Sequence, residues 1–103
     1  MQTPLQITVR GIAHSEALEL RIRDKAAKLE EFHPRITSCR VTVEEVQKHK
    51  QQGREFQVAV DVRLPGKEVV VNRAHAEDAY VAVRDAFDAA KRQIDEFAEL
   101  KQS

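Results

Sequence analysis

Alternation of apolar and polar residues predicts strands at the beginning and in the middle of the chain. Leu5, Ile7 and Val9 are each followed by a polar residue, which is the period of a strand with one buried face. The same period recurs over residues 39–43 and, at its greatest length, over residues 56–64. We therefore expect three strands that each turn one apolar face towards a common core.

The pattern leaves two details of the strands open. Three residues after Val43, the apolar phase of the second strand slips to Val46, which predicts either a β-bulge or the end of that strand. After the turn signal Pro65-Gly66, three valines at positions 69–71 begin a fourth strand. Its buried positions are either 69 and 71, or 70 followed by 72 and 74.

Two segments change to the 3.6-residue period of an amphipathic helix. The first runs from Glu16 to Phe32, with Ser15 in the position of an N-cap and Pro34 preventing continuation. The second runs from about Asp78, whose carboxylate suits a helix start, to about Leu100. The apolar stripe of the first helix, which we expect to be buried, consists of Leu18, Ile22, Ala26, Leu29 and Phe32.

The order of these elements predicts an α+β fold. Short connections make the last three strands an antiparallel meander, and each helix has one apolar stripe to bury. We expect a two-layer sandwich of order β-α-β-β-β-α, in which a four-stranded sheet carries both helices on one face. After one added N-terminal strand, this order matches that of double-stranded RNA-binding domains, which the architecture resembles.

The charges of this neutral chain are unevenly distributed. The 103 residues contain 17 Lys and Arg against 17 Asp and Glu. Residues 1–76 carry 13 basic and 10 acidic side chains, whereas residues 77–103 carry 4 and 7. Neutrality argues against indiscriminate binding to nucleic acid, but the distribution allows a local basic face. The length fits a single domain over residues 1–103.

Residue types that perform catalysis or bind metals are few and scattered. Cys39 lies on the inward phase of its strand and is expected to be a buried apolar residue rather than a nucleophile. The four histidines form no pair at metal-ligand spacing, and three glycines leave no phosphate-binding loop. We expect no enzyme, no metal site and no cofactor. The unpaired cysteine and the absence of an apolar signal or membrane-spanning segment predict a cytoplasmic protein without a membrane partner.

A basic stripe on the first predicted helix is the main candidate for function. Arg21, Lys25 and Lys28 fall within a sector of roughly 60°, beside the apolar stripe. They either pair within the helix, with Asp24 and Glu31, or form a surface that binds phosphates. The full set of candidate cations is Arg21, Lys25, Lys28 and Arg35 on or just after the first helix, Lys48, Lys50 and Arg54 in a predicted basic hairpin loop, and Arg84, Lys91 and Arg92 on the second helix.

Three segments resemble the ribosome hibernation promoting factor family, which includes the ribosome-associated inhibitor proteins. They are Lys-Ala-Ala-Lys-Leu-Glu at 25–30, Glu-Asp-Ala-Tyr-Val-Ala-Val at 77–83 and Arg-Gln-Ile at 92–94. The resemblance extends from Leu5 to about Ile94 in the same order of elements. It implies a domain that binds the small ribosomal subunit between head and body, in the messenger channel and the aminoacyl and peptidyl tRNA sites.

The resemblance also implies roles for individual residues. Lys25, Lys28 and Arg92 match basic positions of the family, and Tyr80 matches an aromatic that we expect to anchor the second helix to the sheet. The chain departs from the family at Ala89, where a basic residue is typical. It also departs at residues 95–99, where acidic side chains would repel rRNA.

These features together predict a non-catalytic translation regulator that sterically inactivates ribosomes under stress or in stationary phase. Its expected partners are the small ribosomal subunit and 16S rRNA, without DNA, and the free protein is expected to be a monomer of the short family type. The alternative is a protein-interaction module that modulates a transcription or stress-response partner. The acidic second helix and the open sheet face favour that alternative.

Overall fold

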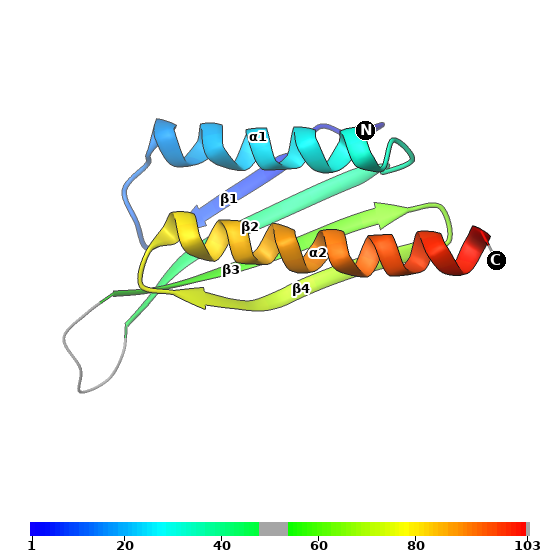
Figure 1. The fold of residues 1–103 in the computed structure, drawn as a ribbon. Helices are drawn as coiled ribbons and strands as arrows, with labels where there is room; N and C mark the ends of the chain where they lie inside the picture. Colours follow the sequence, from blue (N-terminus) through cyan, green and yellow to red (C-terminus); the bar gives the residue numbers. More distant parts are fainter. Residues whose placement is uncertain (48–53, 103) are drawn as a thin grey trace.

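The computed structural model describes residues 1–47 and 54–102. Figure 1 shows both helices on one side of a single sheet, which confirms the predicted two-layer α+β sandwich of order β-α-β-β-β-α. The elements are β1 (Gln6–Arg10), α1 (Glu16–Phe32), β2 (Ser38–Gln47), β3 (Arg54–Leu64), β4 (Lys67–Ala76) and α2 (Ala79–Gln102).

The sheet has the strand order β1-β2-β3-β4. β1 pairs with β2 in parallel, with Ile7 opposite Val41, because α1 returns the chain to the end of the sheet at which β1 began. β2, β3 and β4 form the predicted antiparallel meander. The turn between β3 and β4 places Gly66 at a φ of 80°, a conformation that favours glycine.

The predicted bulge at Val46 is wrong, whereas the predicted strand end lies within one residue of the end of β2 at Gln47. β2 pairs with β3 in one uninterrupted register from Ser38, opposite Arg63, to Gln47, opposite Arg54. Val46 therefore continues the strand on the face away from the helices, where a β-branched residue still suits the backbone. Glu45 takes the inward position, and its carboxylate pairs with Arg54 at 3.1 Å.

β4 contains the irregularity, and it resolves which residues of this strand are buried. Val69 and Val71 point into the core, at 1% and 8% exposure, as the first predicted phase required. The pairing with β3 then shifts between Val58 and Val60, which is a β-bulge in the β4 segment that follows Val71. After the shift, Ala74 and Ala76 pack against the core.

The helix boundaries follow the predicted signals. α1 has the predicted bounds, and the Ser15 hydroxyl accepts a hydrogen bond from the amide of Leu18 at 3.2 Å. At the start of α2, the Asp78 carboxylate accepts a hydrogen bond from the amide of Tyr80 at 2.7 Å. α2 runs two residues further than predicted, to Gln102. Neither helix, over its described residues, is apolar enough to cross a membrane.

The core fills the space between the helices and the sheet. Cys39 is 1% exposed, and burial, assisted by the nearby negative charge of Asp61, raises the pKa of its thiol to about 12. It is a core residue, as predicted. Phe32, in contrast, was expected in the buried stripe and is 64% exposed. It lies about 60° around the helix from Leu29, on the flank of α1 that faces α2.

Candidate nucleic-acid interface

α1 and α2 lie side by side and start at the same end of the sheet (Figure 1). The flank of α1 that carries Arg21, Lys25 and Lys28 faces α2, because Arg21 reaches a residue near the start of that helix. The Arg21 guanidinium carbon lies 5.5 Å from the centre of the Tyr80 ring, a cation–π distance. Tyr80 therefore joins α2 to α1, a contact that the sequence did not predict.

Intrahelical pairing, the alternative to a phosphate-binding stripe, applies to part of α1. Lys28 pairs with Asp24 at 3.4 Å, as the i,i+4 spacing predicts. Arg21 contacts Tyr80 rather than Asp24. Within residues 1–47 and 54–102, neither Arg21 nor Lys25 has a carboxylate within ion-pair distance, so the stripe is only partly neutralised by its own helix.

On α2, Lys91 makes a contact between the helices. Its ammonium donates to Asp95 at 2.8 Å and lies 4.8 Å from the centre of the Phe32 ring. His33 Nε2 lies 2.7 Å from the other oxygen of the same carboxylate. These neighbours lower the pKa of Asp95, mainly through the hydrogen bond from Lys91, although partial burial opposes the shift.

Arg84 and Arg92 differ in where they point. Arg84 follows Tyr80 by four residues and precedes Lys91 by seven, so it shares their flank, and its guanidinium pairs with Asp85 at 3.2 Å. Arg92 is exposed on the side of α2 opposite its buried face, away from α1. Arg84 therefore belongs with the cations between the helices, and Arg92 does not.

The remaining candidate cations lie towards the ends of the molecule. Arg35 is exposed in the connection between α1 and β2, beyond the last turn of α1. Arg54 begins β3 and is engaged by Glu45. Lys48 and Lys50 lie outside the described residues. The structure thus gathers five of the predicted cations, which we call the interhelical basic face: Arg21, Lys25, Lys28, Arg84 and Lys91.

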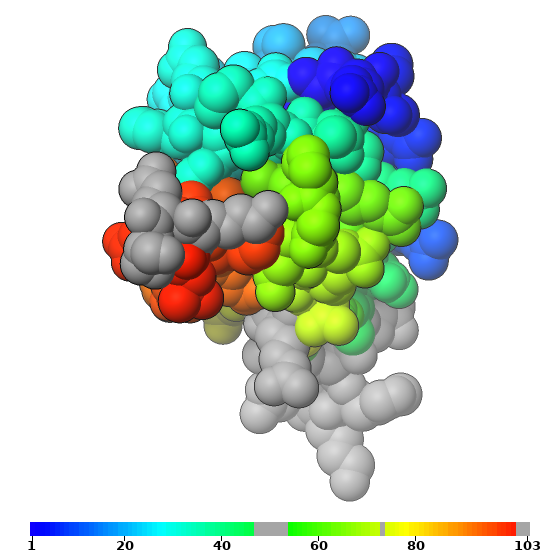
Figure 2. All heavy atoms as spheres, turned by 90° about the vertical axis from the view of Figure 1, so that its right-hand side faces the viewer, coloured from blue at the N-terminus to red at the C-terminus, as the bar shows by residue number. Residues whose placement is uncertain are grey.

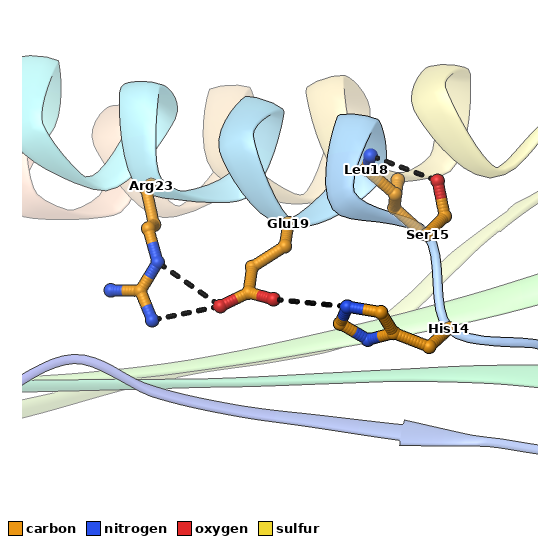
Figure 3. A network of polar contacts seen from close by, with 5 residues as sticks. All are labelled: His14, Ser15, Leu18, Glu19 and Arg23. Carbon is orange, nitrogen blue, oxygen red and sulfur yellow. Dashed lines mark hydrogen bonds and ion pairs between the residues drawn. The ribbon is translucent and has the colours of Figure 1, made fainter.

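The opposite flank of α1 shows why Arg23 is not part of this face. Figure 3 shows the Glu19 carboxylate between Arg23 and His14, on the side of α1 that faces β1. Arg23 donates to Glu19 at 2.9 Å, and His14 Nε2 lies 3.8 Å from that carboxylate. Arg23 therefore lies on the β1 side of α1, away from the flank that faces α2.

A comparison with protein families identifies the chain. Residues 5–102 match the family model described as sigma 54 modulation protein / S30EA ribosomal protein. The chain belongs to this family. The resemblance found in the sequence is thereby confirmed.

Two curated proteins similar to this S30EA-family chain differ in length. The ribosome hibernation promoting factor of Acinetobacter guillouiae is 30% identical over 103 residues, covering 94% of this chain and 90% of that protein. The ribosome hibernation promotion factor of Deinococcus radiodurans is 29% identical over 94 residues, covering 89% of this chain. The match spans 47% of the Deinococcus protein.

Solved structures show the same fold as this S30EA-family chain. A ribosomal subunit interface protein from Coxiella burnetii aligns with a TM-score of 0.78 and 20% identity, over 92% of this chain and 97% of that one. The N-terminal domain of Protein Y from Thermus thermophilus aligns with a TM-score of 0.68 and 23% identity, over 94% and 99%. The resemblance to double-stranded RNA-binding domains stays a prediction.

Sequence reasoning missed two parts of the site in this S30EA-family chain. One is the exposed Phe32 with Lys91 over its ring, and the other is the carboxylate of Asp95 between Lys91 and His33. A helical projection places Phe32 on the flank of Lys25, so its position could have been found. The contacts with α2 could not, because they depend on how the two helices pack. Among the described residues, no group of three His, Cys, Asp or Glu could hold a metal ion.

Proposed function

We propose that this S30EA-family protein is a non-catalytic regulator of translation that binds the small ribosomal subunit. It docks on 16S rRNA in the channel used by messenger and tRNA, and inactivates ribosomes in the cytoplasm under stress or in stationary phase. The family and the names of its two curated relatives support a ribosome-associated role. The proposed activity needs no cofactor, DNA or membrane, and the free protein is a monomer.

The interhelical basic face is the observation that carries this proposal. Its cations come from two helices that lie side by side, so they form one surface rather than two separate stripes. Exposed cationic side chains about one helical turn apart can contact successive phosphates of an RNA backbone. Binding through such a surface follows backbone shape and charge, as is common for structured RNA.

The ion pairs within the face do not prevent it from binding phosphate. The Lys28–Asp24 and Arg84–Asp85 pairs are solvent-exposed, and the side chains of the Lys91–Asp95 pair are 41% and 40% exposed. Exposed ion pairs are worth about 0–1 kcal/mol each, so phosphate oxygens can replace the carboxylates at small cost. Arg21 lies near an aromatic ring rather than a carboxylate among the described residues, so its guanidinium N–H groups can donate to phosphate oxygens.

The proposed mechanism is steric. Both helices are fixed to the sheet by a continuous apolar core, so the basic face is presented by a rigid domain. A rigid domain that occupies the channel excludes messenger and tRNA without making or breaking a bond. Inactivation should therefore reverse when the protein dissociates.

Co-sedimentation with small ribosomal subunits tests the proposal. The double variant Lys25→Glu/Lys28→Glu reverses two charges on the basic face, and we expect its affinity for small subunits to fall at least about tenfold. For a protein bound to phosphates, the logarithm of affinity falls linearly with the logarithm of salt, by about 0.7–0.9 per contact. The slope of the double variant should therefore be shallower by about 1.4–1.8 if two contacts are lost.

Arg10→Glu/Arg40→Glu is the matched control. It changes the net charge by the same amount, and both arginines are exposed on the sheet face away from the helices. Because Arg10 lies opposite Glu44 and Arg40 opposite Asp61, urea denaturation first checks that this variant is folded. We expect this control to bind small subunits with nearly the affinity of the unaltered protein. If both double variants bind equally well, the interhelical basic face is not the contact surface.

The acidic outer side of α2 supports a second candidate function, a protein-interaction module that modulates a transcription or stress-response partner. The exposed carboxylates there are Asp85, Asp88, Glu96 and Glu99. Such a surface suits a basic protein partner better than RNA. Recovery of a protein partner after nuclease treatment, with no rRNA in the untreated sample, would favour this function over ribosome binding.

A further inference from the structure

A cavity at one end of the molecule adjoins the interhelical basic face. Its volume is about 440 Å³, within the range of roughly 300–1,000 Å³ that is typical of ligand pockets. Three segments line it: the end of α1 with the residues that follow, the β3–β4 turn and the last turns of α2. Figure 2 views the molecule from this end, where the three segments meet.

The cavity is lined mainly by apolar side chains, two of them aromatic. Phe32, the last residue of α1, is 64% exposed, although phenylalanine is usually buried. Phe97 is half-buried on the opposite side, in α2. The apolar residues that line the cavity are Phe32, Pro34, Leu64, Pro65, Phe97 and Ala98, with Ile94 at its buried end.

Cations lie beside both aromatic rings. The ammonium of Lys91 is 4.8 Å from the centre of the Phe32 ring, and that of Lys67 is 6.0 Å from the centre of the Phe97 ring. Arg35 lines the cavity itself. The nearby carboxylate of Asp95 is bound by Lys91 and His33, and the exposed Glu96 and Glu99 lie on the outer side of α2. The charges next to the two rings are therefore those of Lys91 and Lys67.

We propose that this cavity binds an unstacked base of single-stranded RNA, whose flanking phosphates contact Arg35 and Lys67. Aromatic rings beside cations are the usual platform for single-stranded nucleic acid, because every base offers a face for stacking. Bases that are not paired are recognised in this way in RNA. The inference rests on the proposed function, since the adjoining basic face is what leads RNA to this end.

Continuity with the basic face favours RNA over an acidic protein segment. Phe32 lies seven residues after Lys25 on the same flank of α1, about 10 Å along the helix axis. A polymer with regularly repeated phosphates can therefore contact the stripe of α1 and place one base in the cavity. A short acidic peptide would contact the cations beside the cavity, but it would not extend to the cations of α1 that continue from them.

Nuclear magnetic resonance titration of the free protein tests this inference without ribosomes. Pentaadenylate is expected to shift the signals of Phe32, Phe97 and Arg35, whereas ribose 5-phosphate, which has no base, should bind at least about fivefold more weakly. Phe32→Ala should weaken pentaadenylate binding at least about fivefold, the lower end of the effect of removing one stacked base. Leu20→Ala is the matched control, because Leu20 is 67% exposed on the same helix but away from the cavity.

Several results would overturn the inference. They are an absence of shifts at the cavity, equal affinity for ribose 5-phosphate, or equal effects of the Phe32 and Leu20 variants. Equal or tighter binding of pentaglutamate at the same residues would instead assign the cavity to an acidic protein segment. If the protein binds small subunits but pentaadenylate shifts no signals of the cavity residues, this site is rejected and the proposed function is not. If pentaadenylate shifts those signals but the protein does not bind small subunits, the proposed function is rejected and this site is not.

Discussion

Neighbours supplied by the fold decide what individual side chains do in this protein. Lys28 pairs with Asp24, as spacing within one helix predicts. Arg21 could also pair with Asp24 on its own helix, but it lies over Tyr80, which belongs to the other helix. Burial of Cys39 was predictable, because strand alternation assigns it to the inward face. Local contacts could therefore be read from the sequence, whereas contacts between helices could not.

Asp61 provides a test at the residue scale. Its Oδ1 is buried without a hydrogen-bond partner in the described residues. Burial, and next the negative charge of Glu68, raise the pKa of its carboxyl, and the positive charges of Arg63 and Arg40 only partly oppose this shift. A raised pKa means that the folded state loses stability as pH rises through it. Asp61→Asn should therefore increase the free energy of unfolding at pH 7, by about 1 kcal/mol.

Urea denaturation at pH 7 and in acid, below the ordinary carboxyl pKa, measures this effect. The stabilisation by Asp61→Asn should shrink in acid, because the unaltered carboxyl is then protonated as well. A variant that is less stable at pH 7 would show that the charge of Asp61 contributes favourably.

At the scale of elements, periodicity and capping residues predicted α1 with its bounds and all four strands. The error at Val46 arose because a β-branched residue can occupy the outer face of a strand, so its position does not reveal the phase. The bulge in β4 could not be read from three consecutive valines. Only pairing with β3 determines that Val69 and Val71 point inwards before Ala74 does.

Asp95 tests the connection between α1 and α2. Its carboxylate contacts Lys91 on its own helix and His33 just after the end of α1. The hydrogen bond from Lys91 is the main cause that lowers the pKa of Asp95. A lowered pKa stabilises the fold above the ordinary carboxyl pKa, and this contribution is lost as pH falls through the folded-state pKa. Asp95→Asn should lower stability at pH 7 by less than about 1 kcal/mol, because the carboxylate is partly exposed.

The same variant should strengthen binding to small subunits, because Lys91 then no longer has a charged partner. Urea denaturation measures the first effect, and co-sedimentation in low salt measures the second. Unchanged stability at pH 7, or weaker binding to subunits, would contradict this role of Asp95.

At the scale of the whole molecule, a neutral chain separates its charges in space. The interhelical basic face combines cations from both helices, whereas carboxylates occupy the outer side of α2. The sequence predicted the part of this face that α1 contributes. Helical spacing also places Arg84 and Lys91 on one flank of α2 and Arg92 opposite its buried face. It did not show that the flank of Arg84 and Lys91 is the one beside α1, since that depends on the orientation of α2.

Directed hydroxyl-radical probing of 16S rRNA tests the central claim most directly. An iron chelate attached at Ala17→Cys would lie one helical turn from Arg21, and one at Thr8→Cys would lie on the sheet face away from the helices. Cys39 is buried with its thiol pKa raised to about 12, so the introduced cysteine is the one that reacts. In complexes with small subunits, we expect strong cleavage of 16S rRNA around the messenger and tRNA channel from position 17 and weak cleavage from position 8. Cleavage from position 8 alone, or none from either position despite binding, would contradict the account.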